Sequence, residues 1–451
     1  MEQSEQPELQ RRFIDWVRES ISLKLFFIGI LILVLLIPSS LIQGLINERA
    51  ARQDEVLRNV SDDWSGSQLI AGPVLIIPYK KHVSYLDADK EKTKDVIEKL
   101  YILPDALHIK AGLKTEVLHK GIYQVVVYNT LVNVSGNFTK ADLSPLNITA
   151  DQLLLDKAKI VFSISDLKGL KTNPTVNTSG KNLPVEPALN DDTLFTNGLQ
   201  ANLDLSTLKD NEVAFNYSLD LKGSQELNFL HLGKTTDVEA DGDSDTPDFG
   251  GRYLPDSRIV KNGKFSARWH MLYYNRPYPQ QWTGNDGQLN NPQKQQLATF
   301  GVKLRLPVDQ YQKTTRTSKY ALLIIILTFI SLFLTEVIRK QRIPTFNYLL
   351  IGAAMIIYYS LLLSFSEQIG FDWAYLAASI ATITLITVFI GSLLKNKGNA
   401  LLFGFILLVF YIFIYVIIQL EDLALMMGSI ALFIVIAVLM YFSRKINWNK
   451  Q

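Results

Sequence analysis

The sequence predicts a mixed membrane protein, with six transmembrane α-helices and one large antiparallel all-β domain inserted between the first and the second helix. Six apolar runs approach or exceed the ~20 residues that a helix needs to cross a bilayer. Between the first and the second run lie residues 47–318, where no window is apolar enough to span. That segment carries short β-branched and aromatic runs bounded by Pro, Gly and Asp, which are typical of strands.

Composition agrees with a membrane bundle joined to a soluble domain. The 451 residues are 48% hydrophobic, and the hydrophobic residues are clustered. The 45 basic and 43 acidic residues nearly cancel, so the chain lacks the basic footprint of a nucleic-acid-binding protein and we expect no nucleic-acid partner. Cysteine is absent, which excludes disulfides, a thiolate nucleophile and Cys-ligated metals.

The chain begins with a polar tail, residues 1–22, followed by the first apolar run, residues 23–46. A basic flank before an apolar run also occurs in secretory signals. This run is longer than a signal and no small-residue cleavage site follows it, so we interpret it as a retained transmembrane helix. Pro38 is expected to kink this helix, which membrane helices tolerate.

Residues 47–318 are interpreted as the β-rich domain. Strand-like runs such as GPVLIIPYKKHVSYL and HKGIYQVVVYNTLVNVSGNF recur with regular spacing, which favours a sandwich or an elongated β-domain. The Asn-Gly pair within residues 261–264 predicts a type I′ hairpin turn. Residues 170–192, rich in Asn, Pro and Thr, are interpreted as a loop-like interruption, and the choice between one and two β subdomains stays open.

The remaining apolar runs form a predicted five-helix bundle over residues 319–442, followed by a polar tail, residues 443–451. The five spans are residues 320–338, 346–363, 373–394, 401–419 and 423–442. With a cytoplasmic N-terminus, the cytoplasmic segments hold twelve Lys and Arg, and the opposite short loops at 365–371 and 419–422 hold none. The positive-inside rule therefore predicts cytoplasmic N- and C-termini, with residues 47–318 on the other side.

Several stretches are similar to one known family. The string PVDQYQKTTRTSKYALLIIILTF, then LLLSFSEQIGFDWAYLAASI and the final SRKINW resemble the CreD inner-membrane family, also described as a colicin-tolerance or cell-envelope-integrity family. GPVLIIPY near the N-terminus and YLPDSRIV in the β-rich segment also resemble it, so the likeness runs through the whole chain in order.

The resemblance implies a multi-pass protein of the bacterial inner (plasma) membrane, with residues 47–318 in the periplasm. It also implies a role in cell-envelope integrity, colicin tolerance and the response to envelope or antibiotic stress. It implies no enzymatic mechanism and no cofactor. The expected partners are the lipid bilayer and an unidentified envelope protein or lipid, and the oligomeric state stays open.

Two function hypotheses of different classes follow. The leading one is a non-enzymatic protein that binds a partner through its periplasmic β-domain. The alternative is a conduit or chaperone for lipid or another apolar molecule between inner membrane and periplasm. An apolar groove in the β-domain that continues into the helical bundle would favour the conduit, and a filled sandwich core would favour partner binding. A hydrolase built from scattered residues also stays open, although the two S-x-x-K matches, at 165–168 and 206–209, lack their S-D-N and K-T-G partners.

Metal chemistry has one weak candidate. The five histidines are scattered without a metal-pair spacing, so we expect no metal site among them. The acidic run Asp237–Asp248 partly matches an EF-hand calcium loop, but it has no flanking helices and ends in Asp. The other interpretation is a solvated strand edge, where charges discourage pairing with other chains.

The candidate functional residues lie where the β-rich segment meets the second span. Aromatic and basic side chains here suit an interfacial anchor among lipid headgroups. The functional interpretation is a docking seam between the β-domain and the bundle, with Asp309 paired to Arg316 or Lys319. The candidate seam residues are Asp309, Tyr311, Arg316, Lys319 and Tyr320.

Carboxylates near the ends of the spans are the other titratable groups in the membrane part. Glu336 is expected to form a local ion pair with Arg339 and Lys340, which lie within one turn of it. Glu367 and Asp372 are expected to lie at the outer interface, where they need no partner. No chain of buried charges, of the kind that proton-coupled transporters use, is visible among the spans.

Overall fold

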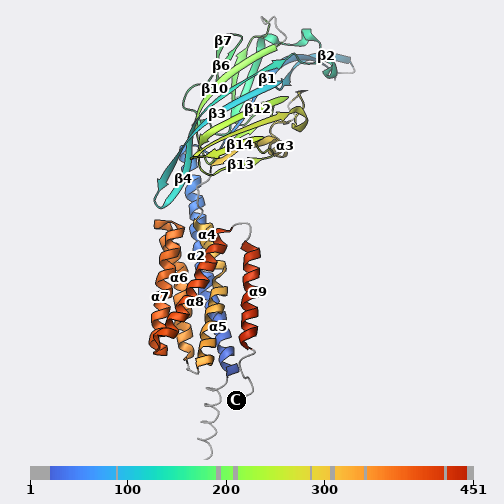
Figure 1. Cartoon of the computed structure of the whole chain (residues 1–451). Coiled ribbons are helices and arrows are strands. Elements are labelled where there is room, and N and C mark those ends of the chain that lie inside the picture. The colour runs from blue at the N-terminus through green and yellow to red at the C-terminus, as the bar shows by residue number, and fades with distance from the viewer. Residues whose placement is uncertain are drawn as a thin grey trace, which may run out of the picture. The chain divides into compact units, whose positions relative to one another are not determined.

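A computed structural model describes most of the chain and divides it into two compact units (Figure 1). The helical unit comprises Met1–Gln53 and Val308–Gln451, and the β unit comprises Asp54–Pro307. The described residues are 21–87, 90–188, 194–206, 212–284, 287–304, 310–339, 343–420 and 424–443.

The helical unit begins with most of α2 (Ile21–Trp64), which contains Pro38 and ends in the β unit. Its other helices are α4 (Gln310–Lys319), α5 (Ala321–Arg339), α6 (Thr345–Ile369), α7 (Phe371–Leu394), α8 (Lys397–Gln419) and α9 (Ala424–Ser443). Four helices in the described part are long and apolar enough to cross a membrane, or five if α4 and α5, bent by 41°, count as one span. The last predicted span coincides with α9, and the count of six stays a prediction.

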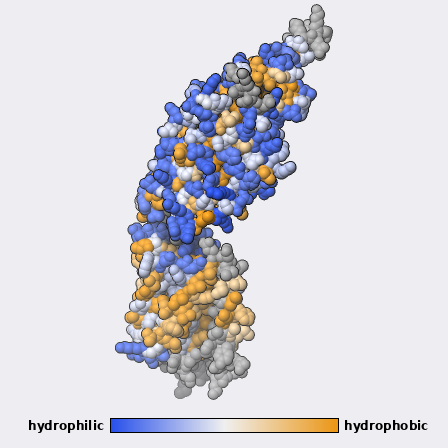
Figure 2. Space-filling view, turned by 45° about the horizontal axis from the view of Figure 1, so that its top comes forward, coloured by the Kyte–Doolittle hydropathy of each residue, from blue (hydrophilic) through white to orange (hydrophobic). Residues whose placement is uncertain are grey.

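The interior of the helical unit is packed with aromatic and aliphatic side chains. Phe329, Tyr348, Tyr358 and Leu407 are fully buried in one cluster. Leu35 of α2 joins this cluster against Gly352 of α6, where an added Cβ would lie 2.3 Å from Leu35 Cδ1. Figure 2 shows hydrophobic residues gathered on the outer face of this unit, as expected of helices surrounded by lipid.

The β unit consists of two sheets. One runs in the order β13-β17-β11-β1-β5-β9-β8, with β2 paired to β1 and β16 to β2. The other runs β14-β15-β12-β3-β4-β10-β6-β7. The strands are β1 (Gln68–Asp87), β2 (Lys90–Ile102), β3 (Ala106–Lys120), β4 (Tyr123–Thr139), β5 (Ala158–Ile164), β6 (Thr175–Thr178), β7 (Lys181–Pro184), β8 (Glu186–Pro187), β9 (Gly198–Leu203), β10 (Glu212–Ser224), β11 (Glu226–Leu230), β12 (Thr235–Asp243), β13 (Pro247–Gly251), β14 (Ser257–Lys261), β15 (Lys264–Leu272), β16 (Gln281–Thr283) and β17 (Thr299–Leu304). A short helix, α3 (Pro292–Ala298), precedes β17.

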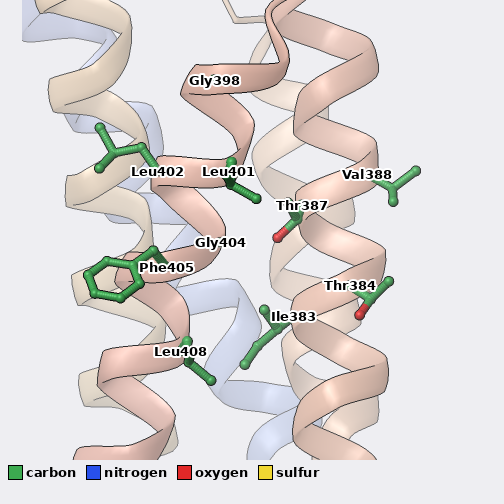
Figure 3. Close-up of a pocket in the computed structure, with 10 residues that line it drawn as sticks. All are labelled: Ile383, Thr384, Thr387, Val388, Gly398, Leu401, Leu402, Gly404, Phe405 and Leu408. Atoms are coloured by element: carbon green, nitrogen blue, oxygen red, sulfur yellow. The ribbon is translucent and has the colours of Figure 1, made fainter.

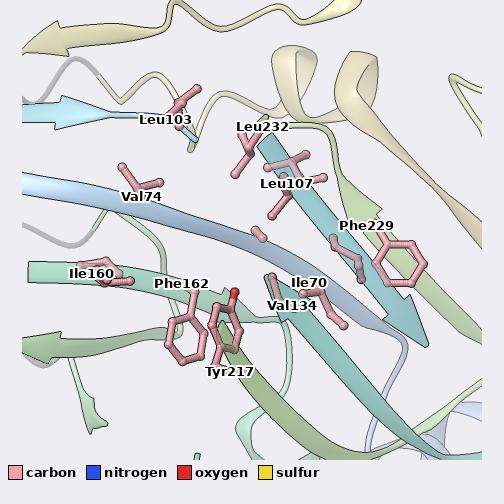
Figure 4. Packing of buried hydrophobic residues seen from close by; sticks show 14 of the residues in the cluster. Ile70, Val74, Leu103, Leu107, Val134, Ile160, Phe162, Tyr217, Phe229 and Leu232 are labelled. Carbon is pink, nitrogen blue, oxygen red and sulfur yellow. The ribbon is translucent and has the colours of Figure 1, made fainter. Parts of the chain in front are cut away.

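A single hydrophobic core lies between the two sheets (Figure 4). Alternate side chains of β3, β4 and β10 are buried, because successive side chains of a strand point to opposite faces. Phe162 of one sheet stacks on Tyr217 of the other, with ring centroids 4.4 Å apart. Ile70, Val134 and Phe229 continue the same cluster. The described core is therefore filled by side chains contributed by both sheets.

Of three expectations about the strands of the β unit, one is confirmed and two are wrong. The hairpin turn is confirmed, because Asn262 and Gly263 have φ of 54° and 73° between the paired strands β14 and β15. The all-antiparallel arrangement is wrong for two pairings, since β1 pairs with β11 and β3 with β12 in parallel. Alternation of apolar residues reveals a strand but carries no information about its partner's direction.

The loop-like interruption at residues 170–192 is also wrong, because β6, β7 and β8 lie in it. Strand β6 pairs with β10 in one sheet, and β8 pairs with β9 in the other. The segment therefore contributes to both sheets. Its short, polar strands lack the long apolar runs by which the other strands are visible in the sequence.

The last part of α2 packs on the β3–β4 hairpin inside the β unit. Val60 forms a small buried cluster with Val125 and Val127. Asp63 lies 3.8 Å from Lys120 Nζ, and Lys222 Nζ lies 5.0 Å from the centre of the Trp64 ring. The end of α2 is thus an integral part of this unit.

Candidate functional site

Helix α4 carries three of the five predicted seam residues, Tyr311, Arg316 and Lys319, and Tyr320 follows it directly. Tyr311, Thr314, Thr317 and Ser318 are buried, three to four residues apart, so they share one helix face. This face packs within the helical unit against α6, α7 and α8. Asp309 lies outside the described residues, so its predicted pairing stays a prediction.

The buried face of α4 is joined to the bundle by a polar cluster. Tyr311 is 4% exposed, and its hydroxyl donates a hydrogen bond of 2.9 Å to Glu367 Oε1 at the end of α6. Arg49 Nε of α2 lies 3.9 Å from the same oxygen. The cluster therefore ties α2, α4 and α6 together, and Glu367 has partners that its position in a short loop did not suggest.

The other predicted seam residues are less enclosed. Arg316 is half-buried, and Lys319 is exposed at the end of α4. Tyr320 is half-buried and packs against the hydrophobic interior of the helical unit. Tyr311, by its hydrogen bond to Glu367, joins α4 to α6. Whether any of the candidate residues contacts the β-domain stays a prediction.

A second polar chain runs from α4 to the start of α7. Lys313 Nζ donates to Gln419 Oε1 at 3.0 Å, and Gln419 Nε2 donates to Asp372 Oδ1 at 2.8 Å. Tyr415 OH donates to the same Asp372 oxygen at 3.0 Å. Asp372 was expected to need no partner and has two. These hydrogen bonds could not be predicted from the sequence, because the residues that form them come from three different helices.

Glu336 forms a third polar cluster with residues far away in the sequence. It is 9% exposed, and its carboxylate accepts hydrogen bonds from Lys24 Nζ and from Tyr348 OH. Lys24 also donates to the carbonyl oxygen of Ile343 at 2.6 Å. The expectation of a purely local ion pair missed these partners. The cluster joins α2, α5 and α6.

Helices α7 and α8 leave a groove between them that runs along much of their length. One part, of about 360 Å³, extends from Asp372 and Tyr415 to Ile383 and Leu408. The other part, of about 730 Å³, shares Ile383 and Leu408 and continues to Gly398. Figure 3 shows Ile383 and Thr387 of α7 and Leu401 and Leu408 of α8 pointing into the space between the helices. We call the two parts together the α7–α8 groove.

The α7–α8 groove is apolar with a few hydroxyl groups. Tyr375, Ser379 and Tyr411 are buried and line the part near Asp372, and the Tyr375 hydroxyl donates to the carbonyl oxygen of Tyr411 at 2.7 Å. The Ser379 hydroxyl lies within reach of the hydroxyl groups of Tyr358 and Tyr375. An apolar groove with a few placed polar groups is a common form of ligand site.

The acidic run at Asp237–Asp248 begins in a strand, so the calcium-loop interpretation is wrong. Strand β12 is paired on both sides, with β3 and β15, and is not an edge strand. Asp237 lies between His270 Nδ1, at 2.6 Å, and His108 Nδ1, at 3.2 Å. Contact with Asp237 raises the pKa of His270. Among the described residues no group of three or more His, Cys, Asp or Glu is arranged to hold a metal.

The same sheet face carries a second row of charges two residues further along. Glu239 accepts from Arg268 Nη2 at 2.7 Å and lies 3.6 Å from Lys110 Nζ. Hydrogen bonding to Arg268 lowers the pKa of Glu239. Each row therefore places one carboxylate between two bases from the neighbouring strands, which explains the alternating acids as cross-strand partners.

Two basic side chains of the β unit, His231 and Arg276, are buried and hydrogen-bonded to groups around them. His231 lies between Thr236 Oγ1, at 3.0 Å from its Nδ1, and the Leu272 carbonyl oxygen, at 3.2 Å from its Nε2. Burial lowers the pKa of His231 to about 4. Arg276 donates to backbone carbonyl oxygens of Leu232 and Tyr278, and burial lowers its pKa to about 10.

The S-x-x-K match that the structure describes has no catalytic arrangement. Ser165 Oγ donates to the Ser67 carbonyl oxygen at 2.7 Å and accepts from the Leu69 amide at 2.9 Å. Lys168 Nζ donates to the carbonyl oxygen of Asp62 at 3.1 Å. Both side chains hold backbone segments in place. The second match ends at residue 209, outside the described residues.

One end of the β unit's core opens into an apolar cavity of about 280 Å³. Its walls come from both sheets and from the segment after β4, and they include Leu75, Ile102, Phe138 and Leu153. Lys140 is the one charged residue among those that line it.

Comparison with known proteins finds matches along nearly all of the chain. The model of the family described as "Inner membrane protein CreD" matches residues 20–449. The chain is 29% identical over 422 residues to "Inner membrane protein CreD" of Escherichia coli (strain K12), covering 92% of this chain and 91% of that protein. Among solved structures, an M1 zinc metallopeptidase from Deinococcus radiodurans matches with 8% identity and a TM-score of 0.19 over 38% of each chain, which carries no argument. The chain belongs to the CreD family of inner membrane proteins.

Proposed function

We propose that this protein acts in cell-envelope integrity by binding an envelope partner through its β unit, without catalysis. The observation that carries this proposal is the β unit's filled core between two sheets, since such a domain offers its outer faces for contact. Exposed apolar side chains on strands β14 and β15 and just after them supply a first contact surface. They are Ile259, Val260, Leu272, Tyr273 and Tyr274.

The proposed topology has six spans, cytoplasmic termini and the β unit in the periplasm. It is supported by the family and by the twelve Lys and Arg of the predicted cytoplasmic segments. Because the chain has no cysteine, single-Cys variants report on topology directly. In intact cells with a permeabilised outer membrane, Ser257→Cys should react with a membrane-impermeant maleimide. Lys397→Cys should react only after the inner membrane is opened, and the reverse pattern would contradict the topology.

The test of partner binding is photocrosslinking in cells. A photoreactive amino acid at Ile259 or Tyr274, which are 67% and 91% exposed, should capture one reproducible envelope component. The matched control is the same amino acid at Lys114 of β3, in the same sheet but away from the apolar surface. Equal yields and the same products at Lys114, or no product at all, would contradict partner binding at this surface.

The alternative proposal, a conduit or chaperone for lipid or another apolar molecule, is favoured by the cavity at the end of the core. Its ~280 Å³ is nearly twice the ~150 Å³ of an apolar protein cavity known to stay dry and bind benzene. Capture of lipid from a photoreactive group at Lys140, the charged residue in the cavity's lining, would support this alternative over the protein-binding function.

A further inference from the structure

We propose that the α7–α8 groove holds one phospholipid with a primary amine in its headgroup. The headgroup lies at Asp372, and one acyl chain follows the groove toward Ile383 and Leu408. This inference concerns the helical unit and does not depend on the function proposed for the β unit. It uses the inner-membrane location of the family and the contacts of α4, α7 and α8.

The length of the groove suits one leaflet. Ile383 lies eleven residues after Asp372 on α7, which is about 17 Å at a rise of roughly 1.5 Å per residue. This is about half of the ~30 Å hydrocarbon core of a bilayer. The part of the groove that opens at Asp372 therefore has the depth of a single lipid layer, and Ile383 and Leu408 mark its inner end.

The walls and the floor of this part differ in character. Leu376, Ile380 and Ile412 are half or more exposed and form apolar walls, whereas Ser379 and Tyr411 are buried. The walls suit an acyl chain. Trp373, 69% exposed, lies at the mouth, where tryptophan commonly meets the headgroup layer.

Ser379 places a hydroxyl group inside the groove. It is 6% exposed and lines the groove, and the hydroxyl groups of Tyr358 and Tyr375 lie close enough to share its hydrogen bonds. A hydroxyl can also bond to an ester oxygen of a ligand, because it is both a donor and an acceptor. Seven residues, roughly 10 Å of helix, separate Ser379 from Asp372. A phospholipid lying along the groove with its amine at Asp372 brings its glycerol ester oxygens to this depth.

The charges at the mouth select the headgroup. Asp372 carries a negative charge and lines the groove, whereas Lys313 carries a positive charge and is joined to Asp372 through Gln419. A zwitterionic headgroup has the complementary order, an ammonium for the carboxylate and a phosphate for the lysine. A primary amine can donate hydrogen bonds to Asp372, which a choline headgroup cannot do. An anionic headgroup without an amine would place its charge against the carboxylate.

The test measures which lipid lies beside Trp373. The purified full chain is reconstituted in phosphatidylcholine vesicles, and brominated phosphatidylethanolamine or brominated phosphatidylglycerol with the same acyl chains is added. Bromine quenches tryptophan fluorescence on contact, and subtracting the signal of Trp373→Phe isolates the contribution of Trp373. We expect the ethanolamine lipid to bind about two- to fivefold more strongly than the other two lipids, the range of one partly exposed charge pair.

Variants distinguish lipid bound in the groove from bulk lipid. Asp372→Asn and Lys313→Gln should bring the ratio close to one, whereas Glu48→Gln, an exposed carboxylate of α2, should leave it unchanged. Ser379→Leu should fill the groove and abolish the preference. Leu385→Phe, on the same helix outside the groove lining, should not.

Three results would overturn the proposal. Equal quenching by all lipids would mean that Trp373 contacts only bulk lipid. A preference for phosphatidylglycerol would mean that Lys313 alone attracts an anion. A preference that survives Ser379→Leu, in a variant that remains folded by circular dichroism and monodisperse in size-exclusion chromatography, would mean that no chain occupies the groove.

Discussion

Lowering the pH from 7 to 4.5 should destabilise the β unit through one buried side chain, His231. Its pKa is about 4 in the folded protein and 6.5 for an ordinary histidine, because burial disfavours the charged ring. Below pH 6.5 the unfolded chain binds a proton that the folded chain does not bind until about pH 4. The free energy of unfolding therefore falls as the pH drops through this window.

The size of the effect follows from the shift. A difference of about 2.5 pKa units at roughly 1.4 kcal/mol each gives an upper bound of about 3.5 kcal/mol, most of it expressed by pH 4.5. The shifted pKa values of three other groups act outside this window. The pKa of His270 is raised, so its contribution is lost only as the pH rises above 6.5. The pKa values of Glu98 and Asp166 are lowered, so their contributions are lost only below about pH 4.5.

The assay is urea unfolding of the purified full chain between pH 7 and 4.5, followed by tryptophan fluorescence, because Trp269 and Trp282 are buried in the β unit. His231→Gln is the matched variant. Its amide can donate to the Leu272 carbonyl oxygen and accept from Thr236 without titrating. We expect the variant to lose the pH dependence of the unfolding midpoint. An equally steep dependence in His231→Gln would refute the assignment to this residue.

Three further predictions concern single contacts. Tyr311→Phe removes the hydrogen bond to its carboxylate partner on α6 and should lower the free energy of unfolding of the helical unit in detergent by about 1 kcal/mol; an unchanged unfolding midpoint would count against that contact. Glu336→Ala and Lys24→Ala should each be destabilising, and the double variant should cost clearly less than their sum, because each single change leaves a charged partner behind; strict additivity would mean that the two do not interact. Gly301→Ala should destabilise the β unit by more than about 1 kcal/mol, because the new Cβ would lie 2.2 Å from the Leu227 carbonyl oxygen; urea unfolding like that of the unchanged chain would contradict the close approach of β11 and β17.

Much of the architecture could be predicted because its signals are local. The spans at 346–363, 373–394 and 401–419 each lie within one observed helix, since an apolar run of this length has few other stable forms in lipid. The turn at Asn262 and Gly263 was predictable for the same reason, because two adjacent residues that tolerate positive φ are enough to define it. The strands of the β unit were visible where they were long and apolar, and were missed at β6, β7 and β8, where they are short and polar.

The sequence by itself determined the membrane class, the charge bias of the loops, the long strands and the family resemblance. Only the tertiary structure decided which strands pair in parallel, that Asp237 meets His108 and His270, and that Glu336 meets Lys24, 312 residues away. It also decided that α7 and α8 leave a groove with Asp372 at its mouth. The physical reason is how far apart in the sequence the interacting residues lie. Length, hydropathy and turn conformation are properties of neighbouring residues, whereas a cross-strand ion pair or a groove between helices exists only after distant segments have packed.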